Sequence, residues 1–296
     1  MSDSNRSSDG FATRAIHLGY DPHDYHGALI PPVFMTSTYA FEDTAQGQRR
    51  FLGEEPGYIY SRVGNPTVSI LEARLASLEG GEAALATSSG MGAITSALWT
   101  LLKAGDILVA DRTLYGCTYG FFQHGLARLG VTIRFVDCTD LDALERALSG
   151  NVRAVFFETP ANPNMRLIDI VAVAALTRRH GALSIVDNTY CTPYLQRPIE
   201  LGADLVVHSA TKYLGGHGDL IAGAVVGRKE LIDEMRFFRR QGNDRRQHLG
   251  HGCLPGPARP EDPGTAHGTA LCQRHDPGQH AGNPSRRGSD PLSEPG

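Results

Sequence analysis

The stretch of sequence that decides the fold is VVHSATKYLGGH, residues 206–217. Its apolar beginning predicts the end of a buried strand, and hydroxyl side chains, glycines and one lysine, Lys212, follow directly. Solubility alone explains such a lysine poorly. An amine held at this place can form a Schiff base while neighbouring hydroxyl and amide groups bind a phosphate. Taken by itself, however, the stretch is more typical of a surface lysine in a glycine-rich loop.

Around this stretch, apolar segments alternate regularly with helical ones. Strands are predicted at 83–86, 106–110, 131–136, 154–158, 183–187, 203–208 and 222–227. Helices are predicted at 67–78, 93–102, 118–129, 141–148, 168–180 and 229–239. This alternation favours a mainly parallel sheet with helices on both faces. We therefore expect one large α/β domain over residues 63–240.

The two ends of the chain depart from this pattern. Residues 1–62 lack sustained periodicity, with an extended piece at 31–39 and a turn at 53–57, and are predicted to form an arm that contacts a neighbouring subunit. Residues 241–296 contain no Val, Ile, Met, Phe, Tyr or Trp and hold eight of the seventeen prolines. Such a segment buries too little apolar surface to offset the entropy of ordering its backbone. We expect either a disordered tail or, preferably, a run translated out of frame.

Composition narrows the classes of partner. A net charge of -4 gives no reason to expect nucleic acid or an anionic membrane as a partner. Five cysteines without paired spacing indicate reduced thiols, and the N-terminus has no apolar signal region. The histidines of residues 241–296 lack the spacing of a zinc site. The expectation is a cytoplasmic protein with no membrane span and no metal site.

Several residues that suit cofactor binding follow predicted strands. Ligands of such sheets bind outside the carboxyl ends of the strands. Gly90 and Met91 lie in a turn that opens a helix, where backbone amides favour a phosphate. Asp187 can pair with a protonated ring nitrogen, Tyr115 can stack on a ring, and Asn162 also follows a strand. Each has an ordinary interpretation as a turn or helix cap. The complete spacing of a dinucleotide fingerprint is absent.

Together these residues resemble the Cys/Met-metabolism family of pyridoxal-phosphate enzymes, which have the aspartate-aminotransferase-like (type I) fold. The motifs that carry the resemblance are YSR with NPT at 60–67, SGM at 89–91, DNT at 187–189 and SATKY at 209–213. Within the family, LYGCT at 114–118 and HSATKYL at 208–214 are most similar to the methionine γ-lyase branch. The resemblance runs from about Phe11 to Phe238. Gly215 departs from it, because the family often has Ser or Asn there.

The resemblance implies a catalytic role for two residues. Lys212 would bind the cofactor as a Schiff base and then move protons between the substrate carbons and the cofactor. Tyr115 would stack on the cofactor ring and act as an acid for the γ leaving group. Cys117, where family members often have another residue, would lie near the substrate side chain and tune specificity.

The resemblance also implies a set of cofactor contacts. Asp187 would keep the ring nitrogen protonated, and Asn162 would contact the phenolic oxygen of the ring. A neighbouring subunit would add two residues from its arm to the phosphate site. The implied phosphate ligands are Gly90, Met91, Ser209 and Thr211, with Tyr60 and Arg62 of that neighbour.

The implied reaction is γ-elimination of L-methionine to methanethiol, ammonia and 2-oxobutanoate by a dimer or tetramer of identical chains. Cystathionine γ-lyase, cystathionine γ-synthase and O-acetylhomoserine sulfhydrylase share these motifs and remain alternatives. The family also has a smaller C-terminal domain that closes the site and supplies an arginine for the substrate carboxylate. Nothing after Gln241 resembles it, so we expect that domain to be missing and γ-lyase activity to be low or absent. A non-catalytic fragment that only binds cofactor or partners is the alternative of another class, and a dinucleotide-binding domain is a remoter one.

Overall fold

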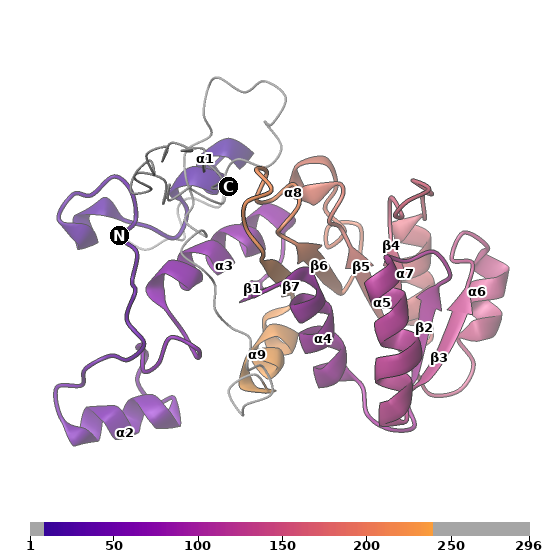
Figure 1. Ribbon diagram of the computed structural model, residues 1–296, viewed down its shortest axis with the longest axis horizontal. Coiled ribbons are helices and arrows are strands. Elements are labelled where there is room, and N and C mark those ends of the chain that lie inside the picture. The colour runs from indigo at the N-terminus through magenta and orange to yellow at the C-terminus, as the bar shows by residue number, and fades with distance from the viewer. Residues whose placement is uncertain (1–8, 239–296) are drawn as a thin grey trace, which may run out of the picture.

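A seven-stranded sheet forms the centre of the protein, of which a computed structural model describes residues 9–238 (Figure 1). The strand order is β1-β7-β6-β5-β4-β2-β3. The strands are β1 Ala83–Thr87, β2 Ile107–Asp111, β3 Thr132–Val136, β4 Val152–Glu158, β5 Leu183–Asp187, β6 Leu205–Ser209 and β7 Gly223–Gly227. Strands β2 to β6 pair in parallel, while β7 runs antiparallel to both β6 and β1. Since β7 is antiparallel to both of its neighbours, β1 and β6 point in the same direction. The predicted α/β class and mainly parallel sheet are confirmed.

Helices cover both faces of this sheet (Figure 1). They are α3 Pro66–Glu79, α4 Gly90–Leu101, α5 Gly116–Gly120, α6 Leu141–Ala147, α7 Ile170–Arg179, α8 Thr192–Leu195 and α9 Lys229–Phe238. Alternate strand residues face opposite sides, as the period of a strand requires. Leu108 packs in the cluster with α4 and α9, whereas its neighbour Val109 packs in the cluster with α6 and α7. Helix α3 covers β1, β6 and β7 on the latter side.

The region from Gly116 to Leu129 is helical but not uniform. After α5 the chain continues as a π-helix, Phe121–Leu126, and a short 3-10 turn, Ala127–Leu129. The prediction of a single helix at 118–129 is therefore correct only in outline. The four-residue helix α8 was not predicted, because one turn is too short to show a helical period.

Two helices form in the described part of residues 1–62, where the sequence shows no sustained periodicity. Helices α1 Phe11–His17 and α2 Thr44–Leu52 form there, with a 3-10 turn at Pro22–Tyr25 between them. Local capping stabilises α2: Asp43 accepts a hydrogen bond from the Gln46 N–H at 2.6 Å, and Gly53 ends the helix at φ 76°. Helix α2 lies well apart from the sheet in Figure 1. In the piece predicted to be extended, residues 31–39, Thr38 forms an isolated antiparallel β-bridge with Tyr60.

Three further expectations concern the C-terminal segment, membrane spans and metal sites. The disordered or out-of-frame segment, residues 241–296, lies outside them. Within residues 9–238, no helix combines the length and apolar character needed to cross a bilayer. In the same range, no three His, Cys, Asp or Glu side chains are grouped so that they could hold a metal ion.

Candidate functional site

The residues singled out in the sequence follow the carboxyl ends of five strands that point the same way. The sheet order places β1, β6, β5, β4 and β2 in one layer, so these ends share one edge. Gly90 and Met91 follow β1, Tyr115 and Cys117 follow β2, and Asn162 follows β4. The last positions on this edge belong to Asp187 of β5 and to Ser209, Thr211 and Lys212 at and after the end of β6.

Helix α4 begins directly against the end of β6. Ser89 caps this helix, its Oγ accepting the Gly92 N–H at 2.9 Å. A Cβ atom added at Gly90 would lie 2.7 Å from Ser209 Cβ, so only glycine permits this approach. The first amides of a helix have no partner within it, and the helix dipole favours an anion there. The turn and the Ser209 side chain therefore form a cradle of the kind that binds a phosphate.

Thr189 connects the strand end of β5 to that of β6. Its N–H donates to Asp187 Oδ1 at 3.0 Å, and its hydroxyl accepts the Ser209 N–H at 2.8 Å. The DNT and SATKY motifs are thus joined by two hydrogen bonds. One side chain therefore connects the Asp187 carboxylate to the cradle at Ser209.

Lys212 lies in a tight turn after β6. Its N–H donates to the Ser209 carbonyl at 3.1 Å, and its side chain is exposed. Thr211 holds this turn to the chain ahead of β7, because its hydroxyl accepts the Ala222 N–H at 3.2 Å. The lysine amine is therefore accessible at the edge where the other candidate residues gather, on a backbone that is fixed on both sides.

Asp187 is a half-buried carboxylate whose environment suits a positively charged partner. It pairs in register with Glu158 of β4 and Val207 of β6. Burial raises the pKa of Asp187, while the hydrogen bonds from Thr189 and the nearby His208 lower it. A cation bound at this carboxylate would favour its ionised form.

A buried polar cluster lies beneath Asp187 and was not predicted. His208 Nε2 is 2.5 Å from Glu79 Oε1, and the Asn188 side-chain amide donates to the same oxygen at 2.9 Å. All three side chains are buried. In the sequence, Glu79 is separated from His208 by most of the domain, so no local signal relates them.

Tyr115 and Asn162 are both held by one carboxyl group, that of Glu158. The Tyr115 N–H donates to Glu158 Oε1 at 2.7 Å, and the Asn162 N–H donates to Oε2 at 3.4 Å. Glu158 was missed in the sequence, although it ends an apolar strand just as Asp187 does. An acidic residue at the end of an apolar strand is the sequence feature from which Glu158 could have been predicted.

The thiol of Cys117 lies next to the phenol of Tyr115. Its Sγ lies within hydrogen-bond distance of Tyr115 Oη, at 3.5 Å, and both side chains are exposed. Hydrogen bonding of the phenol with this sulfur, followed by the negative charge of the thiolate form of Cys117, raises the pKa of Tyr115. The phenol consequently keeps its proton over a wider pH range.

Tyr60 and Arg62 are placed on the arm, in contact with each other. The guanidinium of Arg62 lies over the Tyr60 ring, 5.5 Å from its centre, and Tyr60 pairs with Thr38. These contacts connect Tyr60 to the arm rather than to the strand ends. That a second subunit brings both residues to the site remains a prediction.

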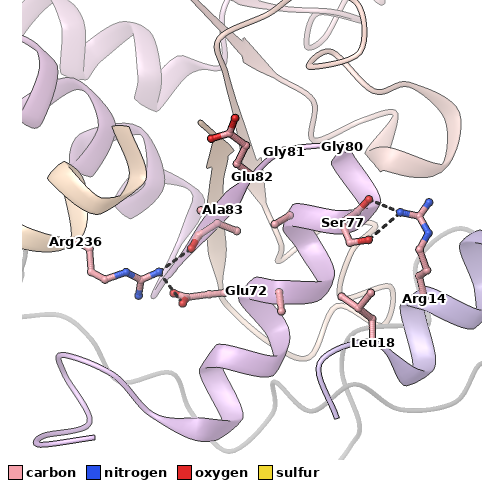
Figure 2. Close-up of a pocket in the computed structure, with 12 residues that line it drawn as sticks. Arg14, Leu18, Glu72, Ser77, Gly80, Gly81, Glu82, Ala83 and Arg236 are labelled. Atoms are coloured by element: carbon pink, nitrogen blue, oxygen red, sulfur yellow. Dashed lines mark hydrogen bonds and ion pairs between the residues drawn. The ribbon is translucent and has the colours of Figure 1, made fainter. Parts of the chain in front are cut away.

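A groove of about 590 Å³ lies elsewhere, at the amino end of β1 (Figure 2). It is bounded by α1, α3, the start of β1 and α9. Figure 2 shows Arg236 of α9 reaching Glu72, while Arg14 of α1 reaches Ser77. Because the candidate residues follow the carboxyl ends of the strands, this groove is no part of the candidate site.

Known proteins share these features. The profile of the Cys/Met metabolism PLP-dependent enzymes matches residues 12–258, which extends past the Phe238 limit set by the motifs. L-methionine γ-lyase of Pseudomonas putida is 61% identical over 228 residues, covering 77% of this chain and 57% of that enzyme. Enzymes of the same name from other bacteria are 54–56% identical. The O-succinylhomoserine sulfhydrylase of Pseudomonas aeruginosa is 42% identical, covering 80% of this chain and 59% of that enzyme.

A solved structure agrees with the sequence comparisons. It is assigned as an O-acetylhomoserine (thiol)-lyase of Campylobacter jejuni and contains a pyridoxyl-lysine monophosphate. The TM-score is 0.72 at 37% identity, with 76% of this chain and 55% of that chain covered. The chain thus spans somewhat more than half the length of the proteins that it matches.

Proposed function

The chain belongs to the Cys/Met metabolism PLP-dependent enzyme family, and from this we propose that its α/β domain is the cofactor-binding part of an enzyme that carries out γ-elimination on L-methionine. The family establishes a type I fold and pyridoxal phosphate as the cofactor. The products of the proposed reaction are methanethiol, ammonia and 2-oxobutanoate. The higher identity to methionine γ-lyases than to a sulfhydrylase supports this substrate.

The observation that carries the proposal is the joined pair of strand ends at β5 and β6. Thr189 ties Asp187 to Ser209, and Ser209 packs against Gly90 at the start of α4. This arrangement fits a ligand with a phosphate at one end and a basic ring nitrogen at the other. Lys212 lies on the same edge, where its amine can reach the ligand.

We assign the chemical roles as follows. When bound, pyridoxal phosphate supplies an electron sink for negative charge that develops on the substrate carbons. Asp187 would keep a proton on the ring nitrogen, and Lys212 Nζ would hold the cofactor and move protons between the substrate carbons. Tyr115 Oη donates a proton to the sulfur leaving group.

The remaining site residues bind or orient. Asn162 would contact the ring oxygen, and Cys117, whose thiol contacts Tyr115, would lie beside the leaving group. The phosphate would be held by Gly90, Met91, Ser209 and Thr211, with Tyr60 and Arg62 contributed by a second copy of the chain in a homo-oligomer.

Action on cystathionine, or on an acylated homoserine, is the second candidate function. The fold similarity to an O-acetylhomoserine (thiol)-lyase supports it. Three rates distinguish these activities: methanethiol release from methionine, cysteine release from cystathionine, and consumption of O-acetylhomoserine. A preference for either of the latter substrates would overturn the assignment to methionine.

Titration of the purified chain with pyridoxal phosphate tests the cofactor site. We expect a visible absorption band that is absent from Lys212→Ala, because the amine is the point of covalent attachment. Lys229→Ala, on the surface of α9, is the matched control and should leave the band unchanged. Identical spectra for wild type and Lys212→Ala would contradict the proposal, and a normal band without turnover of any substrate would favour a non-catalytic, cofactor-binding role.

A further inference from the structure

Glu158 is a buried carboxyl group in the middle of the candidate site. It is the last residue of β4, is 4% exposed, and lies beside Asp187 in the strand register. The motifs quoted above do not include it, and the proposed reaction does not use it. Ionising a buried carboxyl group beside a second carboxyl group costs free energy, so the presence of Glu158 at this edge requires an explanation.

The contacts of Glu158 join two loops that carry proposed site residues. One oxygen accepts the Tyr115 N–H at 2.7 Å, and the other accepts the Asn162 N–H at 3.4 Å. Tyr115 lies just ahead of α5, which no side chain caps and which passes into a π-helix after five residues. The Tyr115 carbonyl accepts the Tyr119 N–H at 3.0 Å, but the Tyr115 N–H precedes the helix and has no acceptor within it, so Glu158 supplies that contact.

We propose that Glu158 is a positioning residue, whose carboxyl group fixes the main chain of Tyr115 and Asn162 and so orients their side chains toward the cofactor ring. This inference depends on the proposed function, because it takes the cofactor roles of Tyr115 and Asn162 from there. It assigns Glu158 no contact with substrate or cofactor.

The surroundings of Glu158 also raise its pKa. Burial, followed by the charge of Asp187, raises its pKa to about 8, against the lowering effect of its two N–H donors. Asp111 of β2 also faces it and raises the pKa further, although Arg166 is paired with Asp111. A cation bound at Asp187 offsets part of this repulsion, so Glu158 ionises more readily. Its hydrogen bonds to Tyr115 and Asn162 then become charge-assisted and stronger.

Glutamine cannot replace Glu158 in this role. Its amide oxygen can accept one of the two N–H groups, whereas its own NH2 group faces the other donor. Glu158→Asp keeps the charge but withdraws both oxygens by one methylene. Glu72→Gln is the matched control, since Glu72 is 7% exposed and also accepts a backbone N–H, that of Ala86, at 2.9 Å.

The experiment measures binding of pyridoxal phosphate to the 296-residue chain, with the circular dichroism of the bound cofactor as a second readout. We expect Glu158→Gln to weaken binding roughly tenfold, as expected for loss of a hydrogen bond to a charged group. The dichroism should change as the Tyr115 ring shifts. In a Tyr115→Ala background the loss from Glu158→Gln should shrink to about threefold or less, because residues that act through one another are not additive. Glu72→Gln should change neither readout.

The outcomes separate this inference from the proposed function. If the wild-type chain shows no cofactor band, the proposed function fails. If it binds cofactor and Glu158→Gln costs the same factor with and without Tyr115, the positioning role is overturned. Should Glu158→Gln not fold, Glu158→Asp is measured in the same two backgrounds. If neither variant folds while Glu72→Gln does, Glu158 is only structural and the inference is overturned.

Discussion

His208 Nε2 lies 2.5 Å from Glu79 Oε1, in a buried pair that joins the last residue of α3 to strand β6. His208 directly precedes Ser209 of the phosphate cradle, and Asn188, which directly follows Asp187, bonds to the same glutamate oxygen. The helix on one face of the sheet is therefore attached to both strand ends that carry the candidate site. Disruption of the pair should affect stability and the site together.

Glu79→Ala should lower the free energy of unfolding by about 3–5 kcal/mol, because it leaves His208 without its buried partner and removes one of the hydrogen bonds of the Asn188 side chain, which still bonds to Gln196. Urea denaturation at constant pH measures the change. Glu200→Ala is the control, since that glutamate is exposed and its ion pair with Arg197 is on the surface. If both variants lost the same free energy of unfolding, the buried pair would contribute no more to stability than the surface ion pair does.

Stability should fall as the pH rises from about 4.5 to about 8, in part because of Glu158. Its pKa is raised from 4.5 to about 8 in the folded chain, so the folded state binds a proton that the unfolded state releases. The stabilisation is complete below the lower value and is lost as the pH rises through the higher one, with a slope of at most about 1.4 kcal/mol per pH unit.

Glu158→Gln should flatten this slope. Asp187, whose pKa is raised in the same direction, keeps part of it, so the slope should not vanish. Urea denaturation at several pH values between 5 and 8 measures it, with the exposed Glu230→Gln as control. If the pH dependence of stability in Glu158→Gln equalled that of the wild type, Glu158 would not be its source.

Gly90→Ala should weaken pyridoxal phosphate binding by roughly tenfold or more, because its methyl group would lie 2.7 Å from Ser209 Cβ and push the helix away from the strand. Titration of the cofactor absorption band measures the loss. Gly120→Ala serves as the control, since a Cβ atom there meets nothing within 4 Å and alanine favours a helix. Binding by Gly90→Ala that equals the wild type would show that the cradle tolerates the shift.

Arg236→Ala should destabilise the free edge of the sheet and increase aggregation. Strand β1 is at that edge, where Arg236 donates to the Ala84 carbonyl at 2.9 Å and Glu72 accepts the Ala86 N–H. The arginine and glutamate also pair with each other, so two side chains cover backbone groups that another strand could otherwise bind. We expect a loss of about 1–3 kcal/mol for an unsatisfied buried group.

Light scattering during mild heating, together with urea denaturation, measures both effects. Arg228→Ala is the control, because Arg228 is largely exposed and its carboxylate partner lies 3.6 Å away. Aggregation of Arg236→Ala no faster than that of the control would contradict a role in protecting the edge.

Much of the fold followed from the alternation of apolar strands with helices. That pattern predicted every strand of the sheet, because the central strands, buried on both faces, are apolar along their length, and the half-buried edge strand β3 still alternates with helices. It failed for α1 and α2, where the capping of α2 by Asp43 and Gly53 and the contact of Arg14 in α1 with Ser77 act in place of a long apolar period. Such features involve few residues and produce little pattern.

The sequence by itself determined which candidate residues for that chemistry are present and at which strand ends they lie. Lys212, Asp187 and the glycine turn at Gly90 each follow a strand, and parallel strands must bring such positions to one edge. Only the tertiary structure decided what holds them there. Thr189 connects two motifs, and Glu158 binds the main chain of Tyr115. Glu79 contacts His208, which is 129 residues away in the sequence. Hydrogen bonds between residues far apart in the chain depend on how the strands are ordered and paired, and that order is set by packing of the whole sheet rather than by any local stretch of sequence.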